Sequence, residues 1–177
     1  MTTQGTSPVA RALARATTAS HVKRLLEHPD TALFGWEIEY DGDVLVTVTL
    51  SARRADYPPD RADVYMLTLD CDSYDVWPPE TKFVNPQSRT YVVGKDAGVL
   101  PVITGLPNLG IHAQFNSFLD RTRVDQLVCF SYTRGYYDSN HAPQPEERWA
   151  SGRHWLYSTI RFLSRALQPP YYQGRAA

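Results

Sequence analysis

The most reactive side chains that the sequence offers are two cysteines, and they occur in different settings. Cys129 lies within the short apolar run Leu127–Phe130, whereas Cys71 continues the alternation of an apolar strand pattern, in step with Leu67 and Leu69. A cysteine is either a small buried apolar residue or, as the thiolate, a nucleophile. Two cysteines make no disulfide framework. The pattern assigns Cys71 to the core and leaves both roles open for Cys129.

The spacing of the remaining residues does not indicate a metal site or a phosphate-binding loop. His141 follows Cys129 by 12 residues and His154 follows His141 by 13, whereas zinc sites usually include one closely spaced ligand pair. Gly94-Lys95 lacks the upstream glycine of a phosphate-binding loop. We therefore expect no metal and no cofactor on this chain.

The segment before these residues reads as a helix followed by a hairpin. Ser7-Pro8 is typical of a helix start, and the helical pattern ends at His28-Pro29, with Thr17-Thr18 as a weak middle that allows two short helices. Apolar residues then alternate with polar ones on both sides of the turn at residues 41–43, as two antiparallel strands require.

The rest of the chain completes a layered pattern. Residues 65–71 read as a third strand and 81–84 as a fourth, and residues 85–126 and 131–148 read as long loops. Apolar residues return at helical spacing from Leu156 to Leu167, and Pro169-Pro170 ends that helix. This order predicts an α+β fold with a flexible N-terminus at 1–7, a single domain at 8–168 and a C-terminal tail at 169–177.

Charge is balanced overall but unevenly distributed. The chain has 18 Lys and Arg against 19 Asp and Glu, a net charge of −1 that gives no sign of nucleic-acid binding. Residues 1–24 and 148–177 hold basic groups and no acidic ones. Such basic ends are either solvated helix faces or a surface for an acidic partner. With neither a long apolar span nor a secretory signal, we expect a cytoplasmic protein that does not enter a membrane.

The order of elements, together with one proline motif, resembles the ubiquitin-conjugating (UBC-like) enzymes and in particular their divergent bacterial members. The motif is Tyr74-x-x-x-Pro78-Pro79-x-x-x-Phe83, with Asp75 where the family has its first proline. Val128-Cys129-Phe130 is similar to the family's cysteine segment, Trp149 to its tryptophan and Leu156–Leu167 to the helix that follows. The family's His-Pro-Asn motif is absent, and the connections on either side of Cys129 are longer than in the family.

This resemblance implies a function and a set of site residues. Cys129 would accept a ubiquitin-like protein as a thioester from an activating enzyme and pass it to an amine on a protein target. Asn108, or with less support Asn116, would place an amide near the oxyanion of the aminolysis step, and His141, with Asp138 next, would deprotonate the incoming lysine. Trp77 and Trp149 are expected to be packing residues.

The first helix is basic in this family and docks on the activating enzyme, which implies a partner-binding role for Arg11 and Arg15. Reversing both charges should then slow charging of Cys129 without unfolding the protein. The alternative function is a catalytically inactive UBC-like binding module that presents its long loops to a partner. The two hypotheses differ at Cys129, which must be reachable in a catalyst and buried under Leu127 and Phe130 in a binding module.

Overall fold

The computed structural model describes residues 7–117, 122, 124–139 and 141–177 and has an α+β architecture. The helices are α1 (Pro8–Leu26), α2 (Pro29–Leu33), α3 (Arg134–Asp138) and α4 (Leu156–Ala166), with a 3-10 turn at Ala97–Val99. The strands are β1 (Glu37–Tyr40), β2 (Leu45–Ala52), β3 (Asp63–Asp70), β4 (Glu80–Val84), β5 (Pro101–Ile103), β6 (Gly110–Asn116), β7 (Val124–Cys129) and β8 (Tyr172–Arg175). Among the described helices, none combines the length and apolar character needed to cross a membrane.

The N-terminal helix forms as the sequence predicts, but without a break in the middle. The Ser7 hydroxyl accepts a hydrogen bond from the Ala10 amide at 3.2 Å, and Pro8 occupies the first turn. Thr18 lies within this continuous helix with its side chain fully buried, and its hydroxyl donates to the Ala14 carbonyl at 2.8 Å. The alternative of two short helices within α1 is therefore wrong. Residues 1–6 of the expected flexible N-terminus lie outside the described residues.

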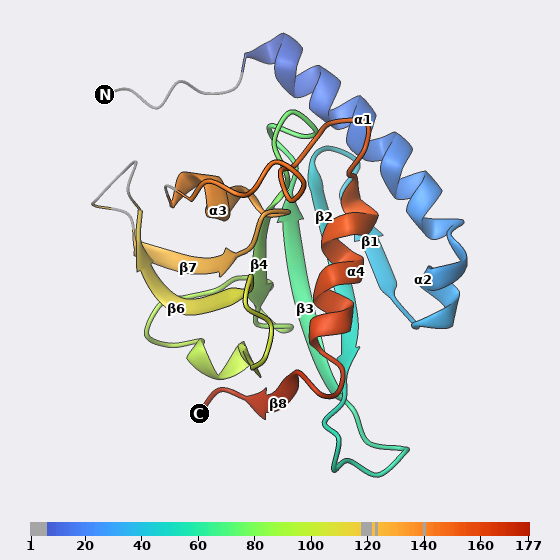
Figure 1. Ribbon diagram of the computed structural model, residues 1–177. Helices are drawn as coiled ribbons and strands as arrows, with labels where there is room; N and C mark the ends of the chain where they lie inside the picture. Colours follow the sequence, from blue (N-terminus) through green and yellow to red (C-terminus); the bar gives the residue numbers. More distant parts are fainter. Residues whose placement is uncertain (1–6, 118–121, 123, 140) are drawn as a thin grey trace.

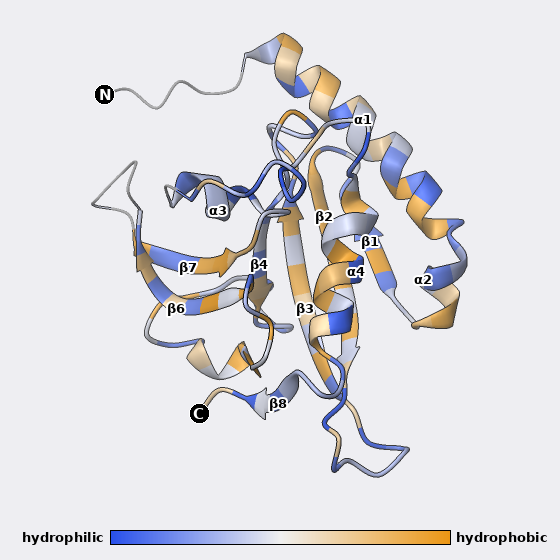
Figure 2. Ribbon diagram, in the orientation of Figure 1, coloured by the Kyte–Doolittle hydropathy of each residue, from blue (hydrophilic) through white to orange (hydrophobic). Residues whose placement is uncertain are grey.

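Strands β1 to β4 form the predicted antiparallel meander, in sequence order across one sheet. At the first hairpin, Asp41 accepts hydrogen bonds from the amides of Asp43 and Leu45 and closes the turn. Helix α4 packs on one face of the sheet, roughly along β2 and β3, and α1 contacts α4 (Figure 1). Apolar residues recur along β2 and β3 (Figure 2), and several of them, among them Val48 and Leu67, belong to the core cluster.

Cys71 is fully buried within that core, which confirms its structural assignment. Its thiol lies 3.8 Å from the Leu69 carbonyl, and burial raises its pKa to about 12. Cys71 is therefore held as an unreactive thiol at neutral pH.

The two segments expected to be long loops contain regular structure, so this part of the prediction is wrong. Residues 85–126 include the 3-10 turn, β5, β6 and the start of β7, and residues 131–148 include α3. Residues 118–121 and 123 of the first segment are outside the described residues. The sequence does not predict β5 because that strand is only three residues long. It does not predict β6 because the β6–β7 pairing shifts register between His112 and Phe115, which breaks the regular alternation of apolar and polar residues.

The β6–β7 hairpin is joined to strand β4 of the main sheet by hydrogen bonds from the side chain of Gln126, not by a ladder of backbone hydrogen bonds. Gln126 is buried, and its amide accepts from the Phe83 amide at 2.7 Å and donates to the Phe83 carbonyl at 2.8 Å. Lys82 and Asp125 form an ion pair at the same contact. This contact ties the first half of β7, the strand that ends at Cys129, to β4.

The folded part of the chain extends beyond residue 168, so the expected tail at 169–177 is not separate from the domain. Strand β8 pairs with β5, and Tyr172 is buried in the core against Tyr65. Asp63 accepts hydrogen bonds from Tyr172 at 2.6 Å and Tyr57 at 2.7 Å. Pro169-Pro170 follows the end of α4, and the chain then continues into β8.

Candidate functional site

Cys129 is the last residue of β7, and its side chain does not belong to the main core. Val128 and Phe130 are core residues, whereas Leu127 and Cys129 lie outside that cluster, as the alternation of a strand requires. Cys129 is 8% exposed. It is therefore buried, but on the opposite face of the strand from Phe130.

That opposite face opens into a cavity of about 280 Å³. Cys129, Asn108 and His141 all contribute to its wall, although they come from the end of β7, the turn before β6 and the segment after α3. The remaining lining residues are Pro107, Leu109, Gly110, Ser131, Tyr136 and Glu147. The structure thus brings together the three residues that the sequence singled out.

The Cys129 thiol has a histidine and a serine as close neighbours. Its Sγ lies 3.8 Å from His141 Nδ1, and that nitrogen lies 2.7 Å from the hydroxyl of Ser139. The Tyr136 ring stacks on the imidazole with the ring centroids 4.8 Å apart. Burial raises the pKa of the Cys129 thiol, and the contact with Ser139 partly offsets that rise.

The two asparagine candidates, Asn108 and Asn116, lie in different parts of the structure. Asn108 Nδ2 donates to Glu147 Oε1 at 2.7 Å, so its amide is oriented at the cavity wall. Asn116 pairs with Val124, at the opposite end of β6 from Gly110, which pairs with Cys129. Asn108, and not Asn116, lines the cavity of Cys129.

The other sequence candidates lie elsewhere. Asp138 pairs with Arg134 at 2.8 Å and does not line the cavity of Cys129. His154 accepts a hydrogen bond from the Ala150 amide at 3.0 Å and packs against Tyr132. Within the described part of the chain, no three potential ligand side chains converge on a point that would hold a metal.

Sequence reasoning missed three polar residues at this site. Ser139 and Glu147 contact His141 and Asn108, and the His112 ring lies over Gly110, where an added Cβ would be 2.8 Å from Nε2 and 3.6 Å from the Cβ of Cys129. The nearness of Ser139 to His141 in sequence was the one available signal. The other two are brought in by the register of β6 and by the segment that follows α3.

The segment after Cys129 is anchored by buried polar contacts. Thr133, which is fully buried, donates its hydroxyl proton to the carbonyls of Val128 and Phe130, at 2.6 and 2.9 Å. The Arg134 amide donates to the Pro79 carbonyl at 3.0 Å and ties α3 to the proline bend. The bend that suggested a resemblance in the sequence therefore helps to hold the wall of the cavity.

A second cavity, of about 370 Å³, shares His141 with the first. Trp149 forms part of its wall and is fixed by its indole N–H, which donates to the Asp75 carbonyl at 2.8 Å. Trp77 is 40% exposed, and the Arg134 guanidinium lies 4.5 Å from its ring centroid. Trp149 is a packing residue as predicted, whereas Trp77 is only partly covered.

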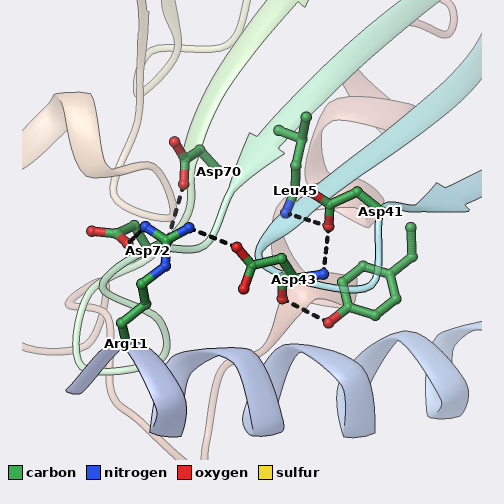
Figure 3. Close-up of polar contacts among 7 residues, drawn as sticks. Arg11, Asp41, Asp43, Leu45, Asp70 and Asp72 are labelled. Atoms are coloured by element: carbon green, nitrogen blue, oxygen red, sulfur yellow. Dashed lines mark hydrogen bonds and ion pairs between the residues drawn. The ribbon is translucent and has the colours of Figure 1, made fainter. Parts of the chain in front are cut away.

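The two arginines predicted to bind a partner have different surroundings, and Figure 3 shows those of Arg11. Arg11 forms ion pairs with Asp43 at 2.6 Å and Asp72 at 2.9 Å, and so links α1 to the turns at one end of the sheet. Arg15 is exposed one turn further along α1. Reversing Arg11 would place a carboxylate beside two others, so Arg15 is the cleaner probe of docking.

Comparison with known proteins adds no family assignment to this geometry. Neither a protein-family model nor a curated protein matches the chain.

Proposed function

We propose that this protein is a divergent UBC-like conjugating enzyme that accepts a ubiquitin-like protein as a thioester on Cys129 and transfers it to an amine. The observation that carries the proposal is the convergence of Cys129, Asn108 and His141 on one cavity wall from three separate segments. The α+β order of one helix, a four-stranded meander and a helix packed on the sheet also supports assignment to the UBC-like fold.

The reaction has two steps, and neither needs a cofactor on this chain. In the first, the Cys129 thiolate attacks the carbonyl carbon of a thioester held by an activating enzyme, and that enzyme's sulfur leaves as a thiolate. In the second, the amine of a protein target attacks the new thioester, the carbon–sulfur bond breaks and Cys129 leaves as a thiolate. The amine loses its proton, and an amide remains.

Two residues that share the cavity with Cys129 have the chemistry that the second step requires. The Asn108 amide is a hydrogen-bond donor for the oxyanion that develops on the attacked carbonyl. The His141 imidazole is a base for the proton of the amine. An intracellular reducing compartment, which we take to be the cytoplasm, would keep the thiol free for this chemistry.

The burial of Cys129 favours the second candidate, a UBC-like binding module without transfer activity. A thiol that is 8% exposed, with its pKa raised by burial, must be reached through the cavity by the partners of both steps. In the binding module the same cavity would present a surface to a partner, and the thiol would remain unused.

The two functions can be separated with ubiquitin that carries a C-terminal thioester to a small thiol. We expect the folded protein to form a one-to-one adduct with ubiquitin, detected by intact-mass spectrometry and cleaved by dithiothreitol. Cys129→Ala should abolish the adduct, whereas Cys71, buried in the core, should remain unmodified in peptide maps. If an adduct forms only after unfolding, the transferase proposal is wrong and the binding module stands.

A further inference from the structure

Ser139 occupies a buried position between α3 and the candidate site. It is 4% exposed and follows the last residue of α3. Its hydroxyl lies 2.9 Å from the Tyr136 carbonyl and 2.7 Å from His141 Nδ1. Both contacts are within hydrogen-bonding distance, and together they restrict where the protons can be.

A serine hydroxyl has one proton to donate, whereas it can accept from two directions. The Tyr136 carbonyl can only accept, so the hydroxyl proton of Ser139 satisfies that contact. The remaining contact, with His141, is then a hydrogen bond only if Nδ1 carries a proton and donates it to the Ser139 oxygen. The alternative arrangement would bring two oxygens with lone pairs to 2.9 Å without a proton between them.

We propose that Ser139 is a positioning residue, which holds His141 in the tautomer with its proton on Nδ1 and so presents an N–H to the Cys129 sulfur. The Sγ–Nδ1 distance of 3.8 Å allows that N–H to be shared between the Ser139 oxygen and the sulfur. The inference rests on the proposed function for the choice of Cys129 as the reacting group.

This arrangement gives the two nitrogens of His141 separate tasks. The Nδ1–H stabilises negative charge on the Cys129 sulfur, both when the thiolate attacks a thioester and when it leaves during transfer to an amine. Because Nδ1 already holds a proton, Nε2 keeps the lone pair. That atom is the one able to take the proton that the attacking amine loses.

The titratable groups around Cys129 are few enough to interpret a pH profile. Tyr136 from α3, together with His141 and Glu147 from the segment after it, lines the cavity, and His112 approaches from β6. Burial raises the pKa of the Cys129 thiol, and a direct contact with the Ser139 side chain acts in the opposite direction. Burial also raises the pKa of Tyr136, which keeps its hydroxyl neutral in the range where a thiol titrates.

The tautomer can be observed directly in the wild-type protein by ¹⁵N NMR of its histidine rings. We expect the His141 signals to be those of a neutral ring protonated on Nδ1, whereas free neutral histidine favours the proton on Nε2. His141→Gln assigns the signals by their disappearance. A His141 ring protonated on Nε2 would overturn the inference, and this measurement requires no change to Ser139.

The effect on the thiol is measured by the rate of alkylation of Cys129 with iodoacetamide as a function of pH. In Ser139→Ala the unprotonated Nδ1 can accept a hydrogen bond from the thiol S–H, which stabilises the neutral thiol, so the midpoint should rise by about one pH unit and the rate at pH 7 should fall about tenfold. Ser139→Thr retains the hydroxyl and should restore the wild-type midpoint. A folded Ser139→Ala protein with an unchanged midpoint would contradict the proposal.

Alkylation and acyl transfer report on different claims. If Cys129 forms no adduct with the ubiquitin thioester and the Ser139 variants still shift the alkylation profile, the proposed function is wrong and the positioning role remains. If the adduct forms and the profile is unchanged, the function stands and Ser139 is a structural residue. Thermal unfolding of each variant shows whether it is folded, and the wild-type NMR measurement decides the tautomer where Ser139→Ala does not fold.

Discussion

At the scale of single residues, the candidate site depends on which side of a strand each side chain takes. Val128 and Phe130 fill the core, and the residue between them, Cys129, is turned to a cavity. Asn108 becomes a candidate for the oxyanion because Glu147 orients its amide at 2.7 Å. The same side-chain type at position 116 lies at the other end of β6 and does not line this cavity.

The two asparagines therefore make a matched pair of variants. Asn108→Ala should slow transfer of ubiquitin from Cys129 to free lysine by about 10²- to 10³-fold, because one donor to the oxyanion is lost. Formation of the Cys129 thioester should change little, and Asn116→Ala should leave both rates close to wild type. Single-turnover discharge followed on non-reducing gels measures this, and equal rates for the two variants would remove Asn108 from the mechanism.

At the scale of elements, α3 positions the segment that carries Ser139 and His141. This five-residue helix approaches β7 closely because Gly135 has no side chain, and an added Cβ would lie 2.6 Å from Cδ1 of the buried Leu127. The contact is tighter than real Cβ atoms allow, so a larger residue must displace either Leu127 or α3. The short helix thus depends on packing rather than on its intrinsic stability.

Gly135→Ala should consequently destabilise the protein by about 1–3 kcal/mol, the usual cost of overpacking a filled site. Gly98→Ala is the matched control, because its Cβ would meet the Ala176 carbonyl at an ordinary 3.9 Å. Its effect should stay within about 0.5 kcal/mol. Urea denaturation at pH 7 compares the free energies of unfolding of the two variants. Equal values would show that α3 or Leu127 shifts to accommodate the added methyl group without loss of stability.

At the scale of the whole molecule, the C-terminal strand closes the fold through a buried hydrogen-bond network. Tyr172 donates to Asp63 and also contacts the Tyr65 hydroxyl at 2.7 Å, which joins β8 to β3 across 107 residues of sequence. Burial acts to raise the pKa of Asp63, but the hydrogen bonds from Tyr172 and Tyr57 and the charge of Arg175 outweigh it, so the pKa lies below its ordinary value.

A depressed carboxyl pKa stabilises the folded state above the pKa of the unfolded chain, and the contribution is lost as the pH falls through the folded value. Tyr172→Phe should therefore cost about 1–3 kcal/mol at pH 7, where Asp63 is ionised and loses a donor. The difference from wild type should shrink only as the pH falls below the ordinary aspartate pKa of about 3.9 and through the lower pKa of folded Asp63, where the carboxylate is lost.

Tyr171→Phe is the control for this prediction, since Tyr171 contacts the exposed Arg165 rather than Asp63. Urea unfolding from pH 7 to pH 3 follows both variants. A loss in Tyr172→Phe that does not depend on pH would mean that the hydroxyl acts through packing or Tyr65 alone, not through the ionised Asp63.

The sequence by itself determined the helices and strands in which the cap residues and the spacing of apolar residues match the face that is buried in the fold. Ser7-Pro8 capped α1, strict alternation defined the strands of the meander and placed Cys71 in the core, and helical spacing from Leu156 defined α4. In these segments the local pattern and the buried face coincide, so a one-dimensional period is sufficient.

The tertiary structure alone decided the site. No local periodicity predicts β6, because its pairing is irregular, or β5 and α3, because they are short. The partner of β8 lies about seventy residues earlier in the chain, so that pairing leaves no local pattern either. Whether Cys129 faced the core or a cavity, and which asparagine stood near it, followed from the pairing of Gly110 with Cys129. Contacts between residues far apart in sequence produce no periodic pattern of apolar residues, because the two partners come close only when the chain folds.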